Sequence, residues 1–322
     1  EQDEAAGNRL VDTAVTEETY DEVEELLGSV AKPAIVVVVV AVLAAFFVYT
    51  GSDPLGLFEP AEVQVAEQAG QPPPELPANS GAGKWWQTMF SDPSAGRNVD
   101  DLTGTIAEQL IYRIDGATES IHIAAFEVDL QPVAEALSRA ARRGVEVQWV
   151  TDDEYGLEID DEEGQLFPMM ERGGVEVRAD DREALMHNKF IIFDDETVWT
   201  GSTNLTENGA FRNNNNVLLL ESPEAAAIYE REFQELWAGQ TGPRSPSTVE
   251  EQELTAASTD LQILFAAEDD VMPRLIALVE NAQESIHFMA FSFTHDDLAG
   301  AMLDKVEEGI EVKGIFETRG SE

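Results

Sequence analysis

In the middle of the chain, the apolar positions switch repeatedly between the spacing of a helix and the spacing of a strand. Thr105 and Glu108 are spaced as in a capping box, and the apolar residues after them recur every three or four positions, which predicts a helix. The stretches at 120–126 and 145–150 are rich in apolar residues and predict two strands, and the segment between them predicts a second helix that ends before Gly144. This alternation favours a layered α/β domain.

A longer apolar run lies near the start of the sequence. No charged or strongly polar side chain occurs from Ala34 to Tyr49, and a run of 16 apolar residues is too long for one strand. A run of this length suits a membrane-spanning helix, so we expect a single anchor at residues 33–50. Lys32 precedes the run and no basic residue follows until Lys84, so the positive-inside rule places the N-terminus in the cytoplasm. We therefore expect a single-pass protein of the cell membrane, with the chain after the anchor extracytoplasmic.

The C-terminal part repeats the pattern of the middle. When the sequence is shifted by 165 residues, residues 111–126 fall on residues 276–291, and the two segments share the pattern E-S-I-H-x-x-A-F. We interpret the chain as one whole α/β unit and the first part of a second. His122 belongs to the repeated pattern and lies within a predicted strand, where packing is its favoured role.

The residues best suited to chemistry lie in the segment HNKFIIFDDETVWTGSTN. His187, Lys189 and Asp194 form an H-x-K-x4-D pattern, and a G-S-x-N turn that includes Ser202 and Asn204 follows it. Strand side chains alternate, so the imidazole of His187 and the ammonium of Lys189 should project from one face. The hydroxyl and the amide of the turn add neutral donors. Charge combined with directed hydrogen bonds suits a tetrahedral anion such as phosphate.

These residues resemble the HKD motif of the phospholipase D superfamily, and the resemblance covers roughly residues 84–322. It implies a layered α/β fold in which two HKD motifs build one active site. The second half-site would come from a missing C-terminal part of the chain or from a homodimer. One histidine attacks phosphorus to give a phosphohistidine, the other protonates the leaving oxygen, and water or an alcohol resolves the intermediate. The resemblance implies no metal and no other cofactor, because lysines and amides neutralise the phosphate.

The family roles can be carried over to individual residues. His187 is the nucleophile or the general acid, with the nucleophile favoured, and Lys189 binds a phosphate oxygen. Ser202 and Asn204 donate to the phosphate or support the motif. Asp194 is a supporting member of the catalytic group and is a candidate for fixing the local backbone.

The sequence departs from the family pattern at one position. Many relatives carry a glutamate after the G-S-x-N turn that helps to orient the histidine, and Asn215 takes that place here. An amide accepts a hydrogen bond but has no charge to stabilise imidazolium. The run of asparagines around Asn215 is equally consistent with a polar turn.

Composition divides the remaining chain, since Pro- and Gly-rich segments are typical of linkers. The predicted segments are an acidic tail (1–32), the transmembrane anchor (33–50), a linker (51–83), the first phospholipase D-like repeat with its HKD motif (84–242), a second linker (243–258) and the start of a second repeat that stops before its own motif (259–322).

Charge narrows the choice of partners. The chain has 64 acidic and 19 basic residues, a net charge of -45, and only five lysines. Such a surface resembles that of salt-in halophiles, where a Debye length of ~3 Å at 1 M salt screens self-repulsion; an acidic secreted protein is the alternative. The charge argues against sequence-independent binding of nucleic acid at low salt, although a local basic groove would still permit it. The absence of cysteine excludes disulfides and thiol catalysis.

Three functions therefore remain. A membrane-tethered enzyme that hydrolyses or transfers phospholipid head groups is favoured, since its anchor would hold it beside its substrate. A nuclease-like phosphodiesterase acting on DNA or RNA is the second, since the stretches at 90–93 and 291–294 are similar to those of the compact nuclease branch. The third is an inactive surface module that binds anions.

Overall fold

A computed structural model describes the fold of most of the chain after residue 71. The described residues are 72–78, 80–95, 99–158, 165–242, 245–246, 252–256, 258–266 and 268–317. The predicted acidic tail and anchor, residues 1–50, lie outside these ranges. Within them, no helix combines the length and the apolar character needed to cross a membrane.

The alternation predicted for the middle of the chain is confirmed. The elements there are α4 (Ile106–Gly116), β3 (Ser120–Ala125), α5 (Gln131–Arg142), β4 (Glu146–Thr151), the π-helical turn η2 (Asp153–Glu158), α7 (Leu166–Arg172) and β5 (Glu176–Ala179). At the start of α4, the Thr105 hydroxyl accepts a hydrogen bond from the Glu108 amide at 3.2 Å. The Glu108 carboxylate in turn accepts from the Gly104 amide at 2.6 Å, one residue earlier than a standard capping box would use.

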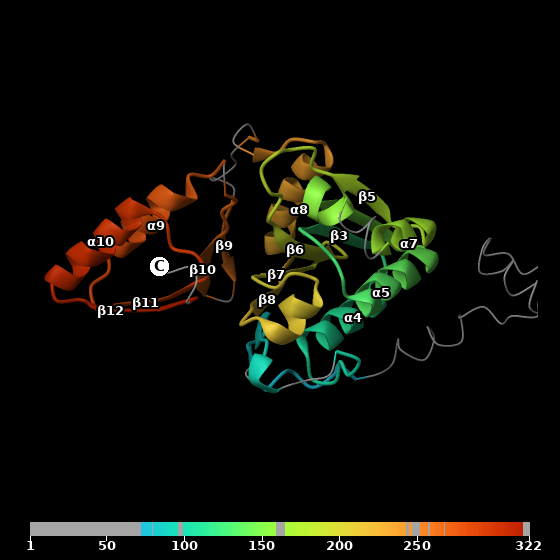
Figure 1. Ribbon diagram of the computed structural model, residues 1–322, viewed down its shortest axis with the longest axis horizontal. Coiled ribbons are helices and arrows are strands. Elements are labelled where there is room, and N and C mark those ends of the chain that lie inside the picture. Colours follow the sequence, from blue (N-terminus) through green and yellow to red (C-terminus); the bar gives the residue numbers. More distant parts are fainter. Residues whose placement is uncertain are drawn as a thin grey trace, which may run out of the picture. The chain divides into compact units, whose positions relative to one another are not determined.

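Eight strands form one sheet in the order β1-β2-β8-β7-β6-β3-β4-β5 (Figure 1). The strands not yet given are β1 (Gly81–Ala82), β2 (Trp86–Phe90), β6 (Lys189–Phe193), β7 (Thr197–Gly201) and β8 (Asn216–Glu221), with the short turns η1 (Pro93–Ala95) and η3 (Asn208–Arg212) beside them. β3, β4 and β5 are parallel neighbours, whereas β6 runs antiparallel to β3 and pairs Lys189 with Ala125. The carboxyl ends of β3, β4 and β5 and the start of β6 therefore share one edge, called here the carboxyl edge.

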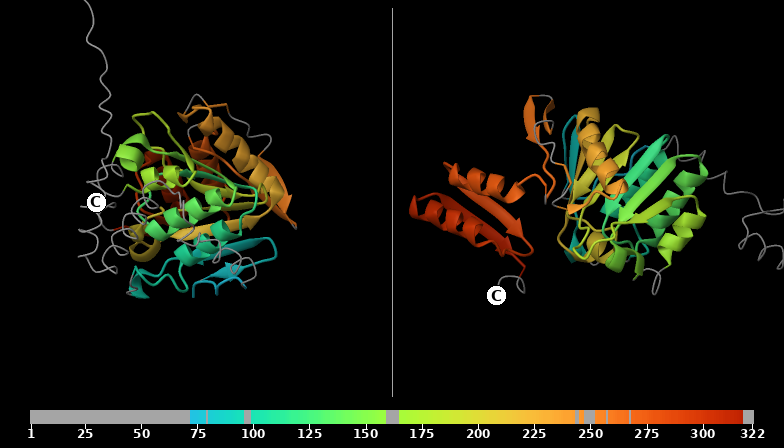
Figure 2. Two further views of the ribbon diagram at one scale, coloured as in Figure 1. Left: turned by 90° about the vertical axis from the view of Figure 1, so that its right-hand side faces the viewer. Right: turned by 90° about the horizontal axis from the view of Figure 1, so that it is seen from above.

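Apolar cores lie on both faces of the sheet. α4, α5 and α7 pack on one face, and α8 (Pro223–Trp237) packs on the other (Figure 2). β3 contributes side chains to both cores, because Ile121 and Ile123 belong to the first core and Ala124 belongs to the second. A strand buried on both faces is rich in apolar residues, and every position of β3 except Ser120 and His122 is apolar.

His122 has the packing role that the sequence favoured. Its ring stacks on Phe233 at a centroid distance of 4.6 Å, and its two nitrogens lie 2.8 Å from Glu230 Oε2 and 3.2 Å from Glu146 Oε1. Burial lowers the pKa of His122, but the two carboxylates outweigh burial, and the pKa is raised overall. The residue thus links β3 to β4 and α8.

The repeat seen in the sequence is present in the backbone. After the hairpin β9 (Glu253–Ala256) and β10 (Thr259–Gln262) come α9 (Val271–Glu280), β11 (Ser285–Ala290), α10 (Asp296–Glu307) and β12 (Glu311–Phe316). A shift of 165 residues carries β3, α5 and β4 onto β11, α10 and β12 without any change of boundary. Even the side-chain pairing recurs, because His287 Nε2 lies 2.9 Å from Glu311 Oε1, as His122 lies beside Glu146.

Candidate active site at the carboxyl edge of the sheet

The histidine and the lysine of the motif meet at one aromatic ring. β6 begins at Lys189, so His187 lies in the segment that leads into the strand, where it is exposed. The imidazole packs edge-on against Phe126, with ring centroids 4.9 Å apart. Lys189 Nζ donates to the carbonyl oxygen of His187 at 3.0 Å and lies 5.6 Å from the centre of the Phe126 ring. An imidazole and an ammonium therefore share one end of the strand.

The surroundings of His187 favour its neutral form. Burial lowers its pKa, the positive charge of Lys189 lowers it further, and Asp152 acts in the opposite direction. Asp152 also holds the backbone just before the histidine, since its carboxylate accepts hydrogen bonds from the amides of Met186 at 2.9 Å and Tyr155 at 2.8 Å. A neutral imidazole has a free lone pair, which a nucleophile requires.

Lys189 belongs to a second group that includes Glu127 and Asn204. Burial lowers the pKa of Lys189 to about 8, although the charge of Glu127 raises it. The pKa of Glu127 is raised, first by burial and then by Asp129. Asn204 donates its Nδ2 to Glu127 Oε1 at 2.7 Å, and its buried Oδ1 has no hydrogen-bond partner among the described residues. At pH 7 this lysine is mostly an ammonium, with one proton committed to the His187 carbonyl and others available to an anion.

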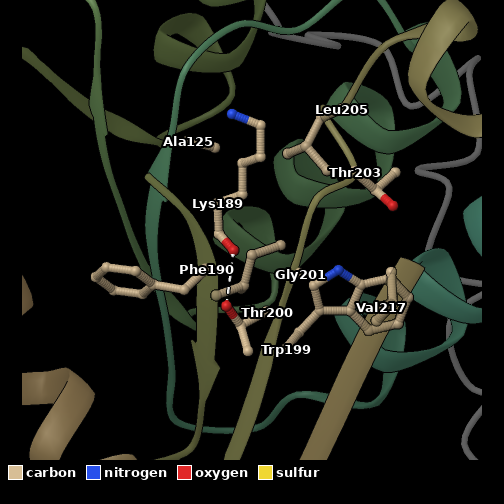
Figure 3. Close-up of a pocket in the computed structure, with 10 residues that line it drawn as sticks. Ala125, Lys189, Phe190, Trp199, Thr200, Gly201, Thr203, Leu205 and Val217 are labelled. Carbon is tan, nitrogen blue, oxygen red and sulfur yellow. Dashed lines mark hydrogen bonds between the residues drawn. The ribbon is translucent and has the colours of Figure 1, made fainter. Parts of the chain in front are cut away.

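The stem of Lys189 crosses a small hollow, shown in Figure 3, and Thr200 Oγ1 donates to the Lys189 carbonyl at 3.1 Å beside it. The hollow is lined by Ala125, Lys189, Phe190, Ile191, Trp199, Thr200, Gly201, Thr203, Leu205 and Val217. Most of these side chains are apolar, and neither His187 nor Asn204 is among them. The hollow therefore accommodates the lysine stem, and His187 is not part of its lining.

The G-S-x-N turn is held together by its own hydrogen bonds. Gly201 has φ +146°, and a Cβ there would lie 2.3 Å from the carbonyl oxygen of Asn216, so a side chain is excluded. The Ser202 hydroxyl donates to Asn215 Oδ1 and accepts from the Asn216 amide, both at 3.0 Å. Asn215 Nδ2 donates to the Gly209 carbonyl at 2.9 Å. Asn215, expected in the place of a histidine-orienting glutamate, thus directs its side chain to the turn.

The structure does not bring Asp194 to the other motif residues. Asp194 follows the last residue of β6 and His187 precedes the first, so a five-residue strand of about 17 Å separates them. The Asp194 carboxylate accepts hydrogen bonds from the backbone amides of Thr118, Glu119 and Ser120 at 2.7–3.1 Å. Asp194 therefore fixes the connection between α4 and β3. The structure thus places Asp194 apart from His187 and Lys189, and its expected role in fixing the backbone fits the geometry.

Sequence reasoning missed three residues around the motif, namely Phe126, Glu127 and Asp152. All three directly follow β3 or β4, at the carboxyl edge. The available signal was a polar or aromatic residue just after a buried apolar run. That signal becomes useful only when the strand order is known, because the order places the ends of β3 and β4 near the start of β6.

Known proteins resemble this chain over the same region. A family model described as the phospholipase D-like domain of cardiolipin synthase matches residues 110–237. A mitochondrial cardiolipin hydrolase of Canis lupus familiaris is 28% identical over 181 residues, which cover 56% of this chain and 65% of that protein. A phospholipase D of Rickettsia bellii is 34% identical over 142 residues, which cover 44% of this chain and 64% of that protein. The match thus spans less than two thirds of the length of each of these two relatives.

The fold also has a counterpart among solved structures. A polyphosphate kinase from Porphyromonas gingivalis superposes with a TM-score of 0.50 at 13% identity, covering 72% of this chain and 37% of that one. At this identity the likeness concerns the fold alone. It agrees with the mixed α/β layers predicted from the hydrophobic pattern.

Proposed function

Because the chain belongs to the phospholipase D superfamily, we propose that it is a phosphodiesterase that hydrolyses or transfers phospholipid head groups through a phosphohistidine on His187. The observation that carries the proposal is the exposed imidazole of His187 beside the ammonium of Lys189. The names of the two relatives, a cardiolipin hydrolase and a phospholipase D, support a lipid substrate.

The proposed reaction has two displacements. In the first, the neutral imidazole of His187 forms a nitrogen–phosphorus bond while the bond from phosphorus to the leaving oxygen breaks. A proton from a general acid passes to the leaving alcohol, and Lys189 neutralises a non-bridging phosphate oxygen. In the second, water or an alcohol forms a bond to phosphorus and gives its proton to the general acid of the first step, now a base, while the nitrogen–phosphorus bond breaks and frees the imidazole. The lowered pKa of His187 supports the nucleophilic role over that of the acid.

The general acid is proposed to be the histidine of a second HKD half-site, supplied by a second repeat or by a second copy of the chain. We further propose that residues 33–50 anchor the enzyme in a membrane, with the catalytic domain on the extracytoplasmic side. This arrangement would hold the active site close to lipid head groups.

The test is head-group release from vesicles of phosphatidylcholine, phosphatidylethanolamine or cardiolipin by the full chain in about 1 M salt, where the charged surface is screened. Ethanol added to the assay should divert part of the phosphatidic acid into phosphatidylethanol, because a phosphohistidine can be resolved by an alcohol. His187→Asn should abolish both products. His287→Asn is the matched control, since that histidine is exposed and pairs with Glu311 in the second unit.

Each outcome separates the alternatives. Cleavage of DNA or RNA without lipid turnover would replace the lipid substrate by nucleic acid while keeping the role of His187. Binding of vesicles without turnover in any substrate would support an inactive anion-binding module. Equal activity in the two histidine variants would reject the mechanism.

A further inference from the structure

Three carboxylates gather at the carboxyl edge beside the candidate active site. Asp152 follows β4 and Asp180 follows β5, and the parallel pairing of Thr151 with Ala179 places these two strand ends side by side. Asp153 comes next in the chain and begins η2. One oxygen from each of the three carboxylates lies within 4.8 Å of the others.

Asp180 is buried without adequate compensation. Its residue is 5% exposed, and neither side-chain oxygen has a hydrogen-bond partner among the described residues. Arg182 Nε lies 3.6 Å from Asp180 Oδ2, which is beyond a normal hydrogen bond. Burial and then the charges of Asp152 and Asp153 raise the pKa of Asp180 to about 6, while Arg182 and the Asp153 amide act in the opposite direction. One guanidinium, that of Arg182, therefore faces a group of three carboxyl side chains.

A buried carboxylate without partners costs several kcal/mol unless a cation or a set of donors compensates it. The other two carboxylates already accept hydrogen bonds. Asp152 accepts from the backbone amides of Tyr155 and Met186, and Asp153 accepts from the Glu154 amide at 2.9 Å. Each of these oxygens keeps a second lone pair. The cluster therefore offers carboxylate oxygens with free lone pairs, and Arg182 is the cation that the structure places against it.

We propose that Asp152, Asp153 and Asp180 form a binding site for one divalent cation, and that the cation is Ca²⁺. Carboxylate oxygens are ligands for hard cations. Ca²⁺ binds oxygen at 2.3–2.6 Å, so opposite ligands stand about 4.6–5.2 Å apart, whereas opposite Mg²⁺ ligands stand about 4.0–4.2 Å apart. One oxygen from each carboxylate lies within 4.8 Å of the others, a separation that the larger coordination sphere of Ca²⁺ accommodates. Water would complete the coordination from the half-exposed side of Asp153.

The cation would join the ends of β4 and β5. Through the hydrogen bond of Asp152 to the Met186 amide, it would also steady the segment that carries His187. The site stands apart from the phosphoryl chemistry, so its existence does not depend on the proposed function.

The test is calcium binding by the full chain, stripped with a chelator and titrated calorimetrically with CaCl₂ in about 1 M KCl, which screens weak surface binding. The key variant is Asp180→Asn. The matched control is Asp181→Asn, which removes the same charge from the adjacent exposed residue. Wild type and control should bind one Ca²⁺ per chain, and Asp180→Asn should bind at least tenfold more weakly.

Thermal unfolding gives a second readout. When free Ca²⁺ exceeds the Kd by about a hundredfold, the midpoint of wild type and control should rise by about 5–10 °C. In the chelator, Asp180→Asn should unfold at or above the wild-type temperature, because a buried charge has been removed. Asp153→Asn changes the half-exposed carboxylate of the cluster and should also weaken Ca²⁺ binding. It replaces Asp180→Asn as the test variant if Asp180→Asn does not fold. Equal Ca²⁺ binding by wild type, Asp180→Asn and Asp153→Asn would overturn the proposal, as would no binding at all, which would leave Arg182 as the only counterion.

Discussion

Replacing Asp194 with alanine tests whether the aspartate of the motif acts in chemistry or in folding. Its carboxylate accepts hydrogen bonds from three consecutive backbone amides, those of Thr118, Glu119 and Ser120. A hydrogen bond to a charged group contributes about 1.5–3 kcal/mol when buried. These bonds are mostly solvent-exposed and not additive, so we expect the carboxylate to contribute about 2–3 kcal/mol in total. For a domain of this size the midpoint of thermal unfolding should fall by about 4–10 °C.

The backbone at this position needs its own control. Asp194 has φ +52° and the adjacent Asp195 has φ +54°, so alanine at either site carries a similar left-handed backbone penalty of about 1 kcal/mol. Asp195 is exposed, and one of its carboxylate oxygens lies within 4.8 Å of His122 and Glu230, so Asp195→Ala reports the backbone penalty together with the loss of that contact. The comparison of the two variants removes the shared backbone penalty.

The assay compares unfolding in urea with phosphodiesterase turnover, measured below the unfolding transition of both variants. We expect Asp194→Ala to lose stability and to keep the turnover of each folded molecule within about twofold of wild type. Turnover reduced by a hundredfold or more at unchanged stability would refute the reasoning. It would show that a carboxylate about 17 Å from His187 nonetheless takes part in the reaction.

Three further outcomes are expected. Gly201→Ala should lower the free energy of unfolding by about 2–4 kcal/mol, measured in urea, because its Cβ would meet the Asn216 carbonyl at 2.3 Å on a left-handed backbone. Glu127→Gln should move the alkaline loss of kcat/KM to lower pH, because Glu127 raises the pKa of Lys189, which is about 8 in the wild type; an unchanged pH profile would contradict this coupling. His122→Gln should remove the stabilisation that comes from the raised pKa of His122 in the folded protein. That stabilisation is complete below the unfolded pKa of about 6.5 and is lost as pH rises through the folded pKa. The difference in unfolding free energy between wild type and variant should therefore shrink between about pH 5.5 and 8.5.

Local pattern predicted the elements of the fold well. The strands at 120–126 and 145–150 were visible because β3 and β4 contribute apolar side chains to the cores on both faces of the sheet and are therefore rich in apolar positions. The repeat was visible because the same buried positions recur 165 residues later, and the backbone follows them. The order of the strands in the sheet could not be predicted in this way. Neighbours such as β3 and β6 are far apart in sequence and pair through contacts that no local pattern records.

The candidate site was predictable only in part for the same reason. His187 and Lys189 are two residues apart, so one strand brings them together. Glu127 and Asp152 reach them from other strands, and their relevance depends on the order of the sheet. Asp194 was grouped with the site because it lies near His187 in the sequence. In space, strand β6 separates Asp194 from His187.

The half-buried amine at the start of β6 also makes the protein easy to label selectively. The chain has five lysines, and an ordinary lysine has roughly one free amine in 2,500 at pH 7. With a pKa of about 8, Lys189 has roughly one in ten. A reagent that acylates free amines at neutral pH should therefore modify position 189 before the other four lysines, and an anionic ligand bound to its ammonium should slow that modification.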